Sequence, residues 1–340
     1  MTANLHVRSR LAGLVLSMAI LAGCQEGASL AATTDALTLE RKIPLGDVAG
    51  RLDHLAVDLA RHRLFLAELG NNTIGVVDIA AGTILHRIDG LDEPQGVGYV
   101  PDTDTIYVAN AGDGTLRTYR STDFSPIAAL KLGDDADNIR VDPKASQVIV
   151  GYGKGALALL DAAAGKRTGQ IALAGHPEAF QLDPSGVRIY VNVPDARQIA
   201  VIDRSASKQV ATWALPDAGD NFPMALDAEG ERLLVVYRRP ALLAVFDTGS
   251  GAVATRLSTC GDADDVFVDA KRQRAYVSCG EGAIAVLQKE ADGYRELGRI
   301  PTVFGARTSL WVPELDRLFL AVRARGNERA AVWVYRPADR

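Results

Sequence analysis

Residues 261–282 read GDADDVFVDAKRQRAYVSCGEG and alternate short apolar runs with polar and glycine-rich turns. Its first apolar run, VFV, ends at Asp269, and a short polar turn leads into a second run, AYV. A glycine-rich turn then precedes a third run, AIAVLQ, at residues 283–288. Short apolar runs bounded by Gly and Asp are typical of strands joined by tight turns. The stretch therefore predicts three consecutive short strands.

The same pattern recurs along the chain at intervals of about 42 residues. Its seven copies have first strands that begin at His54, Gly96, Asn138, Ala179, Pro223, Asp265 and Thr308. A period of about 40–45 residues with four strands per copy is the signature of propeller blades. One such blade has two apolar faces, which are buried only when blades stack around an axis and the ring closes. We therefore predict an all-β, seven-bladed β-propeller over residues 37–340.

An outer, fourth strand follows the third in the first six copies, whereas the chain ends soon after the third strand of the seventh. Residues 37–45, LTLERKIPL, read like the missing outer strand. We expect this N-terminal strand to pair beside residues 331–335 and close the last blade. The alternative, two separate sheet domains, does not account for the even spacing.

Three of the copies contain a similar sequence motif: IYVAN at 106–110, IYVNVPDARQIAVID at 189–203 and AYVSCGEGAIAVL at 275–287. They resemble the YVTN-type β-propeller repeat family, and the resemblance extends over essentially all of the chain after the N-terminal segment. It implies the propeller fold. It does not select an activity, because such repeats occur in proteins that bind, scaffold or catalyse.

The N-terminus has the pattern of a targeting segment. Arg8 and Arg10 precede the apolar run LAGLVLSMAILAG at residues 11–23, and Cys24 follows. A basic segment, a short apolar core and small residues at the end are typical of a secretory signal. The run is shorter than the roughly 20 apolar residues that a membrane-spanning helix needs. We predict a signal peptide over residues 1–23.

The residues around Cys24 point to a lipid anchor. LAGC at 21–24 resembles a bacterial lipobox, which implies cleavage before Cys24 and a diacylglycerol on its sulfur. Two or more acyl chains give stable anchoring. Gln25 resembles the pattern of outer-membrane sorting, so we expect a lipid-anchored protein that faces the periplasm at the outer membrane. Residues 24–36 are small and polar and read as a flexible tether. An ordinary cleaved signal that contains a Cys is the alternative.

The net charge and hydrophobic content limit the classes of binding partner that we expect. A net charge of −5 gives no reason to expect nucleic acid, because that binding usually shows a strong basic excess. A hydrophobic content of 48% is that of a globular protein. We expect a monomer that meets a small-molecule ligand or another envelope protein, and contacts the membrane through its lipid anchor.

The position just before each first strand predicts a site. In propellers the innermost strand of each blade lines the axial channel, so these positions form a ring made by Asp53, Gln95, Asp137, Glu178, Phe222, Asp264 and Arg307. His54, Asn138 and Asp265 stand one position further on. Crowded carboxylates raise one another's pKa or attract a cation. We predict a ligand-binding mouth made by Asp53, His54, Gln95, Asp137, Asn138, Glu178, Asp264, Asp265 and Arg307.

Hard oxygen ligands suit Ca²⁺ or Mg²⁺, so four of these residues are candidate metal ligands: Asp53, Asp137, Glu178 and Asp264. The alternative is that they cap strands and hold water in the channel. Arginines are expected at the same face, namely Arg238, Arg239, Arg323, Arg325 and Arg329. They could hold a carboxylate or phosphate through bidentate hydrogen bonds, or pair with nearby acids. His176 also reaches this face.

Two functional interpretations follow. The first is a rigid scaffold that binds a ligand or protein at its mouth. The second is a divalent-metal-dependent hydrolase, because the ring resembles, in general terms, the metal mouth of the lactonase and gluconolactonase propellers. A structural partner of a periplasmic oxidoreductase is a third possibility. The sequence contains no GxSxG elbow, HExxH or Walker A motif, so it does not decide whether the protein is an enzyme.

Cys260 and Cys279 remain as a pair once Cys24 is assigned to the lipid. Cys260 precedes the first strand of the sixth copy and Cys279 ends the adjacent antiparallel strand, so both point toward the same end of the blade. An oxidising compartment favours a disulfide. We predict a structural disulfide; two free thiols or a redox-active pair are the alternatives, although no CxxC spacing occurs.

Overall fold

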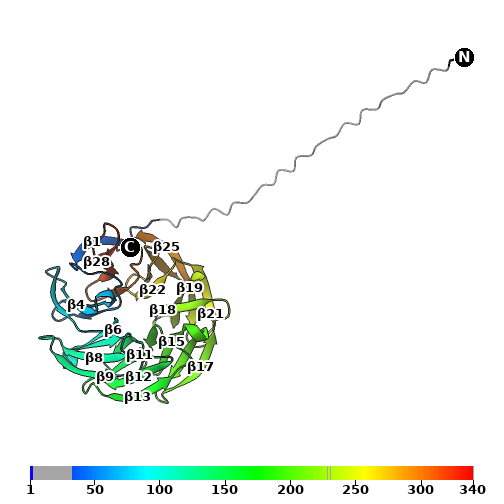
Figure 1. Cartoon of the computed structure of the whole chain (residues 1–340). Coiled ribbons are helices and arrows are strands. Elements are labelled where there is room, and N and C mark those ends of the chain that lie inside the picture. Colours follow the sequence, from blue (N-terminus) through cyan, green and yellow to red (C-terminus); the bar gives the residue numbers. More distant parts are fainter. Residues whose placement is uncertain (3–32, 228, 230, 340) are drawn as a thin grey trace. The chain divides into compact units, whose positions relative to one another are not determined.

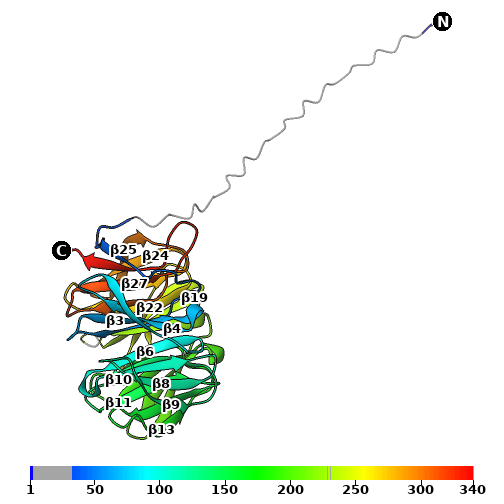
Figure 2. The ribbon, with the colours of Figure 1, turned by 60° about the vertical axis from the view of Figure 1, so that its left-hand side comes forward.

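The computed structural model describes residues 1–2, 33–227, 229 and 231–339, and residues 37–337 form seven four-stranded antiparallel sheets. The sheets follow one another around a central axis in chain order, from blue through green to orange (Figures 1 and 2). This arrangement confirms the predicted seven-bladed propeller with four strands in each blade.

Blades one to six take their strands in sequence order from the axis outward. Blades one to three contain β2 (Leu55–Asp58), β3 (Arg63–Glu68), β4 (Thr73–Asp78) and β5 (Thr83–Ile88); β6 (Pro94–Val100), β7 (Thr105–Asn110), β8 (Thr115–Arg120) and β9 (Pro126–Lys131); β10 (Ala136–Asp142), β11 (Gln147–Tyr152), β12 (Ala156–Asp161) and β13 (Arg167–Ala172). Three short 3₁₀ helices lie between strands: η1 (Leu69–Asn71), η2 (Pro101–Thr103) and η3 (Pro194–Ala196).

Blades four to six repeat the same order. They contain β14 (Phe180–Leu182), β15 (Arg188–Val193), β16 (Gln198–Asp203) and β17 (Lys208–Ala214); β18 (Gly219–Asp227), β19 (Arg232–Arg239), β20 (Ala241–Asp247) and β21 (Val253–Ser258); β22 (Ala263–Asp269), β23 (Arg274–Cys279), β24 (Ala283–Glu290) and β25 (Gly293–Pro301). Blade seven is built from both ends of the chain: β26 (Ser309–Val312), β27 (Arg317–Val322), β28 (Ala331–Pro337) and β1 (Leu37–Pro44).

The N-terminal strand closes the ring. β1 lies beside β28 as the outer strand of blade seven (Figure 1), with Leu37 opposite Pro337 and Pro44 opposite Ala331. Ile43 of this strand is fully buried and packs in a cluster with Leu64 of blade one and Phe319 of blade seven. The predicted closure is therefore confirmed, and it is supported by apolar packing as well as by backbone hydrogen bonds.

The middle strands of each blade are buried on both faces, which explains why their sequences are apolar runs. All six residues of β7, TIYVAN, are buried, whereas the outer strand β9, PIAALK, is exposed at five of its six residues. The apolar clusters lie between blades; one joins Phe65 and Val76 of blade one to Ile106 and Val108 of blade two. Each such side chain contributes roughly 1.5–3 kcal/mol when it is fully buried.

The first hairpin of every blade turns through a residue with positive φ. Those residues are His62, Asp104, Ser146, Gly186, Glu231, Gln273 and Asp316, with φ between 49° and 78°. Gly186 takes this left-handed conformation without a steric penalty. The other six positions hold L-residues with a side chain, which rarely adopt it. His62 thus has a turn role and lies at the opposite end of the blade from the predicted mouth.

Cys260 and Cys279 form the predicted disulfide, with Cα atoms 5.8 Å apart. Cys260 precedes β22 and Cys279 ends β23, so the bridge joins the two segments of blade six that lead toward the mouth. Both residues are fully buried in the cluster that packs blade five on blade six.

Cys24 and all but the first two residues of the predicted signal peptide lie outside the described residues. Within the expected tether, Thr33 forms a parallel bridge with Arg299, and Ala36 is buried. The last residues before β1 therefore already contact the propeller. No helix in the part of the chain that the structure describes is long and apolar enough to cross a membrane.

Candidate functional site

The structure brings the whole predicted ring together around one cavity. This mouth cavity has a volume of about 270 Å³ and lies at one end of the axial channel. It is lined by the seven ring residues, Asp53, Gln95, Asp137, Glu178, Phe222, Asp264 and Arg307, and by Arg51, His54, Asp135, His176 and Arg238. Asn138 and Asp265, the other predicted members, are buried below it.

Backbone pairing with the second strand fixes the ring positions. The N–H of Asp53 donates to the carbonyl of Ala67 at 2.8 Å, and the N–H of Glu178 donates to the carbonyl of Asn192 at 3.0 Å. Asp53 and Glu178 thus extend the first hairpin of their blades. Gln95, Asp137, Phe222 and Asp264 instead lie inside the first strand, at a register shift between that strand and the second. Because the hairpin repeats in every blade, the same sequence position meets the axis each time.

On the side of blades five to seven, the acids of the mouth are paired with arginines. Arg307 contacts Asp264 at 2.9 Å through Nε and Asp262 at 2.8 Å through Nη1. Arg238 donates to Asp264 as well, and its guanidinium lies 3.8 Å from the centre of the Phe222 ring. These arginines neutralise neighbouring carboxylates, which is the alternative that the sequence left open.

The other four predicted arginines, Arg239, Arg323, Arg325 and Arg329, do not line the mouth cavity with them. Arg239 is 82% exposed and pairs with Asp220, and Arg325 lies over the ring of Phe304 at 4.2 Å. Neither of these two residues lines the mouth cavity. At the rim, Arg51 contacts Asp53 at 2.9 Å and supplies the remaining arginine contact of the mouth.

On the side of blades three and four, two carboxylates have no such partner. Asp137 is only 6% exposed, and its Oδ1 atom accepts no hydrogen bond from the described residues. Glu178 lines the same wall, and its side chain makes no hydrogen bond or ion pair within the described part of the chain. Burial raises the pKa of Asp137, and burial together with the charge of Asp137 raises the pKa of Glu178 well above its usual value.

His54 forms the floor of the mouth. Its Nε2 atom lies 3.8 Å from Asp53 and 3.9 Å from Asp137, and its Nδ1 atom lies 3.9 Å from Asp265. Burial alone would lower the pKa of His54, but the charges of Asp265 and Asp53 raise it above the usual value. Burial raises the pKa of Asp53 and of Asp265 to about 7, although His54 opposes both shifts.

The proposed metal ligands are not arranged as a metal site. Among the described residues, no group of three or more His, Cys, Asp or Glu side chains is placed to hold a metal ion. Oxygen ligands lie about 2.3–2.6 Å from Ca²⁺. Here the imidazole of His54 stands between Asp53 and Asp137, and Asp264 is turned toward arginines. The residues present do not fit Ca²⁺ or Mg²⁺, so the hydrolase alternative lacks its ligand set.

Some residues of the site were missed by the sequence analysis. Arg51 and Asp135 line the mouth from two residues before a ring position, and Asp262 pairs with Arg307 from the same place in blade six. These three residues are charged, and each stands two positions before a ring residue in the sequence, so this common spacing could have identified them. Asp135 and Asp262 have their pairing partners, His176 and Arg307, in other blades, and a single repeat does not reveal those.

No family model matches the chain, and no curated protein matches it. Among solved structures, a chain of the Kuenenia stuttgartiensis Hydrazine Synthase superposes with a TM-score of 0.72 and 16% identity over 81% of this chain and 93% of that one. A chain of the Crystal Structure of Mitotic Checkpoint Complex gives a TM-score of 0.71 and 13% identity over 96% and 99%. At these identities the likeness shows the propeller fold alone, which is compatible with a protein-binding scaffold.

Proposed function

We propose that the protein is a lipid-anchored envelope propeller of the YVTN-repeat type whose mouth binds a small ligand through a protonated amine. One observation carries the ligand class: Asp137 and Glu178 line the mouth as buried or half-buried carboxylates without a hydrogen-bonded partner among the described residues. A buried charge is costly unless it is paired, so a cation that enters this wall recovers free energy.

An ammonium group fits this wall better than a metal ion does. It needs hydrogen-bond acceptors within about 2.7–2.9 Å rather than a closed shell of ligands. The wall offers Oδ1 of Asp137, which accepts no hydrogen bond from the described residues and lies 3.9 Å from Nε2 of His54, and the carboxylate of Glu178. The arginines on the opposite side are already engaged. The mouth cavity of about 270 Å³ limits the ligand, or the part of it that enters, to a small molecule.

Calorimetric titration of the full chain tests this binding. We expect putrescine to bind and butane-1,4-diol, which has the same length without charge, not to bind. The Asp137→Asn and Glu178→Gln variants should each weaken putrescine binding by about tenfold, since hydrogen bonds to charged groups are strong. Glu314→Gln, at an exposed acid outside the mouth, is the control. Equal binding of the diol and the diamine, or no binding of either, would contradict the proposal.

The location is supported by the lipobox-like LAGC at residues 21–24 and by the disulfide, which suits an oxidising compartment. Mass spectrometry of the mature N-terminus should find Cys24 as the first residue, carrying diacylglycerol. The Cys24→Ser variant should leave the membrane fraction that holds the wild type. A mature chain that begins elsewhere, or retains an unmodified Cys24, would overturn the anchor but leave the amine site standing.

A further inference from the structure

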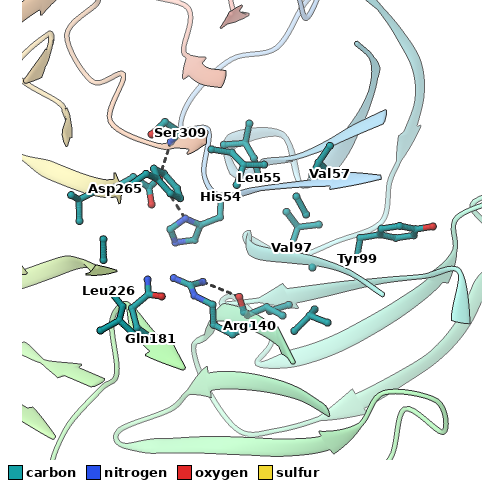
Figure 3. Close-up of a pocket in the computed structure, with 18 of the residues that line it drawn as sticks. His54, Leu55, Val57, Val97, Tyr99, Arg140, Gln181, Leu226, Asp265 and Ser309 are labelled. Carbon is teal, nitrogen blue, oxygen red and sulfur yellow. Dashed lines mark hydrogen bonds and ion pairs between the residues drawn. The ribbon is translucent and has the colours of Figure 1, made fainter. Parts of the chain in front are cut away.

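A second cavity lies on the other side of His54. This lower chamber has a volume of about 410 Å³, within the range of about 300–1,000 Å³ that is usual for small-molecule sites. Residues from all seven blades line it, and His54 and Asp265 close the end nearer the mouth (Figure 3). The chamber is separate from the amine site, since its lining shares only His54 with the mouth cavity.

The chamber owes its space to small residues on the inner strands. Ala56, Gly98 and Ala225 occupy equivalent positions in blades one, two and five, where blades six and seven have Phe267 and Leu310. Gly98 is required by close packing, because a Cβ atom there would lie 2.8 Å from Ile139 Cγ2. The result is a chamber with an apolar wall on the side of blades six, seven and one.

Arg140 is the one arginine among the residues that line this chamber. Its Nε donates to the carbonyl of Phe180 at 3.0 Å, and its Nη1 donates to the carbonyl of Ile139 at 2.9 Å. Nη1 also donates to Oδ1 of Asn138 at 3.3 Å. Nη2 donates to none of the described residues, and the guanidinium makes no ion pair with any of them. This differs from Arg238 and Arg307 in the mouth, each of which contacts a carboxylate.

The acid at the end of the chamber does not serve as the partner of Arg140. Asp265 accepts from the N–H of Ser309 at 2.7 Å and faces Nδ1 of His54 at 3.9 Å. Gln181 is likewise fixed, because its Nε2 donates to the carbonyl of Met224 at 2.8 Å. Figure 3 shows Arg140 and Gln181 reaching into the chamber that His54 and Asp265 close. Arg140 thus offers a free Nη2 donor in a chamber whose polar lining also includes His54, Tyr99, Gln181, Asp265 and Ser309.

We propose that the lower chamber binds a small apolar carboxylate, with its carboxylate on Nη2 of Arg140 and its hydrocarbon body against Phe267, Leu310 and Ala56. Burial lowers the pKa of Arg140, and the pairing with an anion would offset that cost. The apolar wall supplies the burial of hydrocarbon, and the guanidinium fixes the orientation. The proposal does not depend on amine binding at the mouth.

The test is calorimetric titration of the full chain with cyclohexanecarboxylate and with its uncharged counterpart, cyclohexylmethanol. We expect one site per chain for the carboxylate and an affinity for the alcohol that is lower by about tenfold or more. Ala56→Phe fills the chamber and should abolish binding, whereas Arg239→Gln, at the exposed arginine outside both cavities, should leave it unchanged. Arg140→Gln should lower carboxylate affinity to that of the alcohol.

Thermal melting of each variant shows whether it is folded. The comparison of carboxylate with alcohol binding uses the wild type, so it does not depend on the folding of any variant. Equal affinity for the two probes would overturn the role of Arg140. Carboxylate binding that survives Ala56→Phe would place the anion elsewhere, and absence of saturable binding at millimolar concentration would remove the site.

Discussion

Asp264 and Asp137 occupy equivalent positions in blades six and three, yet their surroundings differ. Asp264 receives Arg238 and Arg307, whereas Oδ1 of Asp137 accepts no hydrogen bond from the described residues. The backbone repeat places both carboxylates at the mouth; residues of the neighbouring blades determine what each does there. Position in the repeat therefore predicts where an acid lies but not whether it stabilises the fold or remains available to a ligand.

Two consequences follow for energetics. On the side of Asp264, the paired side, the carboxylate neutralises half-buried arginines. Removing that carboxylate leaves an arginine without its partner. On the unpaired side, burial of Asp137 costs folding free energy, which a bound cation would recover. The two sides should therefore respond to substitution with opposite signs.

The largest expected change in the free energy of unfolding comes from removing the Cys260–Cys279 disulfide, which lies in blade six with Asp264. The Cys260→Ala, Cys279→Ala double variant opens a loop closed over 19 residues and should lower the free energy of unfolding by about 3 kcal/mol. Urea unfolding measures it, and the wild type under reductant is the control that should lose a similar amount. A loss below about 1 kcal/mol would show that the bridge adds little to this side.

The second effect breaks the pairing itself. Asp264→Asn leaves Arg238 and Arg307 with less negative charge and should lower the free energy of unfolding by about 2 kcal/mol, because these side chains are 14–23% exposed rather than fully buried. Glu314→Gln, an exposed acid, should change it negligibly. A variant as stable as the wild type would mean that the ion pairs contribute nothing here.

The third prediction concerns pH. Burial raises the pKa of Asp53 and Asp265 to about 7, so between about pH 4 and pH 7 the unfolded chain releases protons that the folded chain keeps. The free energy of unfolding should therefore fall as pH rises through this window. The raised pKa of His54 adds to the trend, since its stabilisation is lost as pH rises through that pKa.

Melting temperatures from about pH 5 to about pH 8 measure this dependence, outside the acidic range in which surface carboxylates titrate. Asp265→Asn should flatten the profile. Stability that rises with pH across the window would contradict the assigned shifts.

The smallest effect has the opposite sign. Asp137→Asn removes a buried carboxylate whose Oδ1 accepts no hydrogen bond from the described residues and should raise the free energy of unfolding by about 1 kcal/mol near pH 8. Burial raises the pKa of Asp137, so the gain should shrink as the pH falls through that raised pKa and the folded chain keeps the proton. Destabilisation equal to that of Asp264→Asn would remove the distinction between the two sides.

The sequence predicted the fold and the ring because both depend on a repeat that can be read along the chain. Seven evenly spaced hairpins require a closed ring, and the residue before each hairpin must meet the axis. Residues 37–45 were identified as the closing strand because the last copy lacks one. The cysteines were paired because Cys260 precedes, and Cys279 ends, two adjacent antiparallel strands of one blade.

The contacts between blades were not predictable in the same way. Arg238 and Asp264 are 26 residues apart, and nothing in either repeat specifies which acid an arginine will reach. The position of His54 among Asp53, Asp137 and Asp265 likewise depends on the width of the channel. Arg140 left a signal, since NIRVD places a charge inside an inner strand where other copies have Ala, Gly, Gln, Phe or Leu. Only the structure shows that Arg140 lines the lower chamber.

Proton exchange during amine binding tests whether the amine binds at Asp137 and Glu178. Titration of the full chain with putrescine at a series of pH values, in two buffers of different ionisation enthalpy, counts the protons exchanged. An ammonium beside Asp137 and Glu178 lowers the pKa that burial has raised, so protons should be released. The Asp137→Asn, Glu178→Gln double variant should release none. Binding without proton exchange, or with the same exchange in the double variant, would contradict the assignment of the amine to this wall.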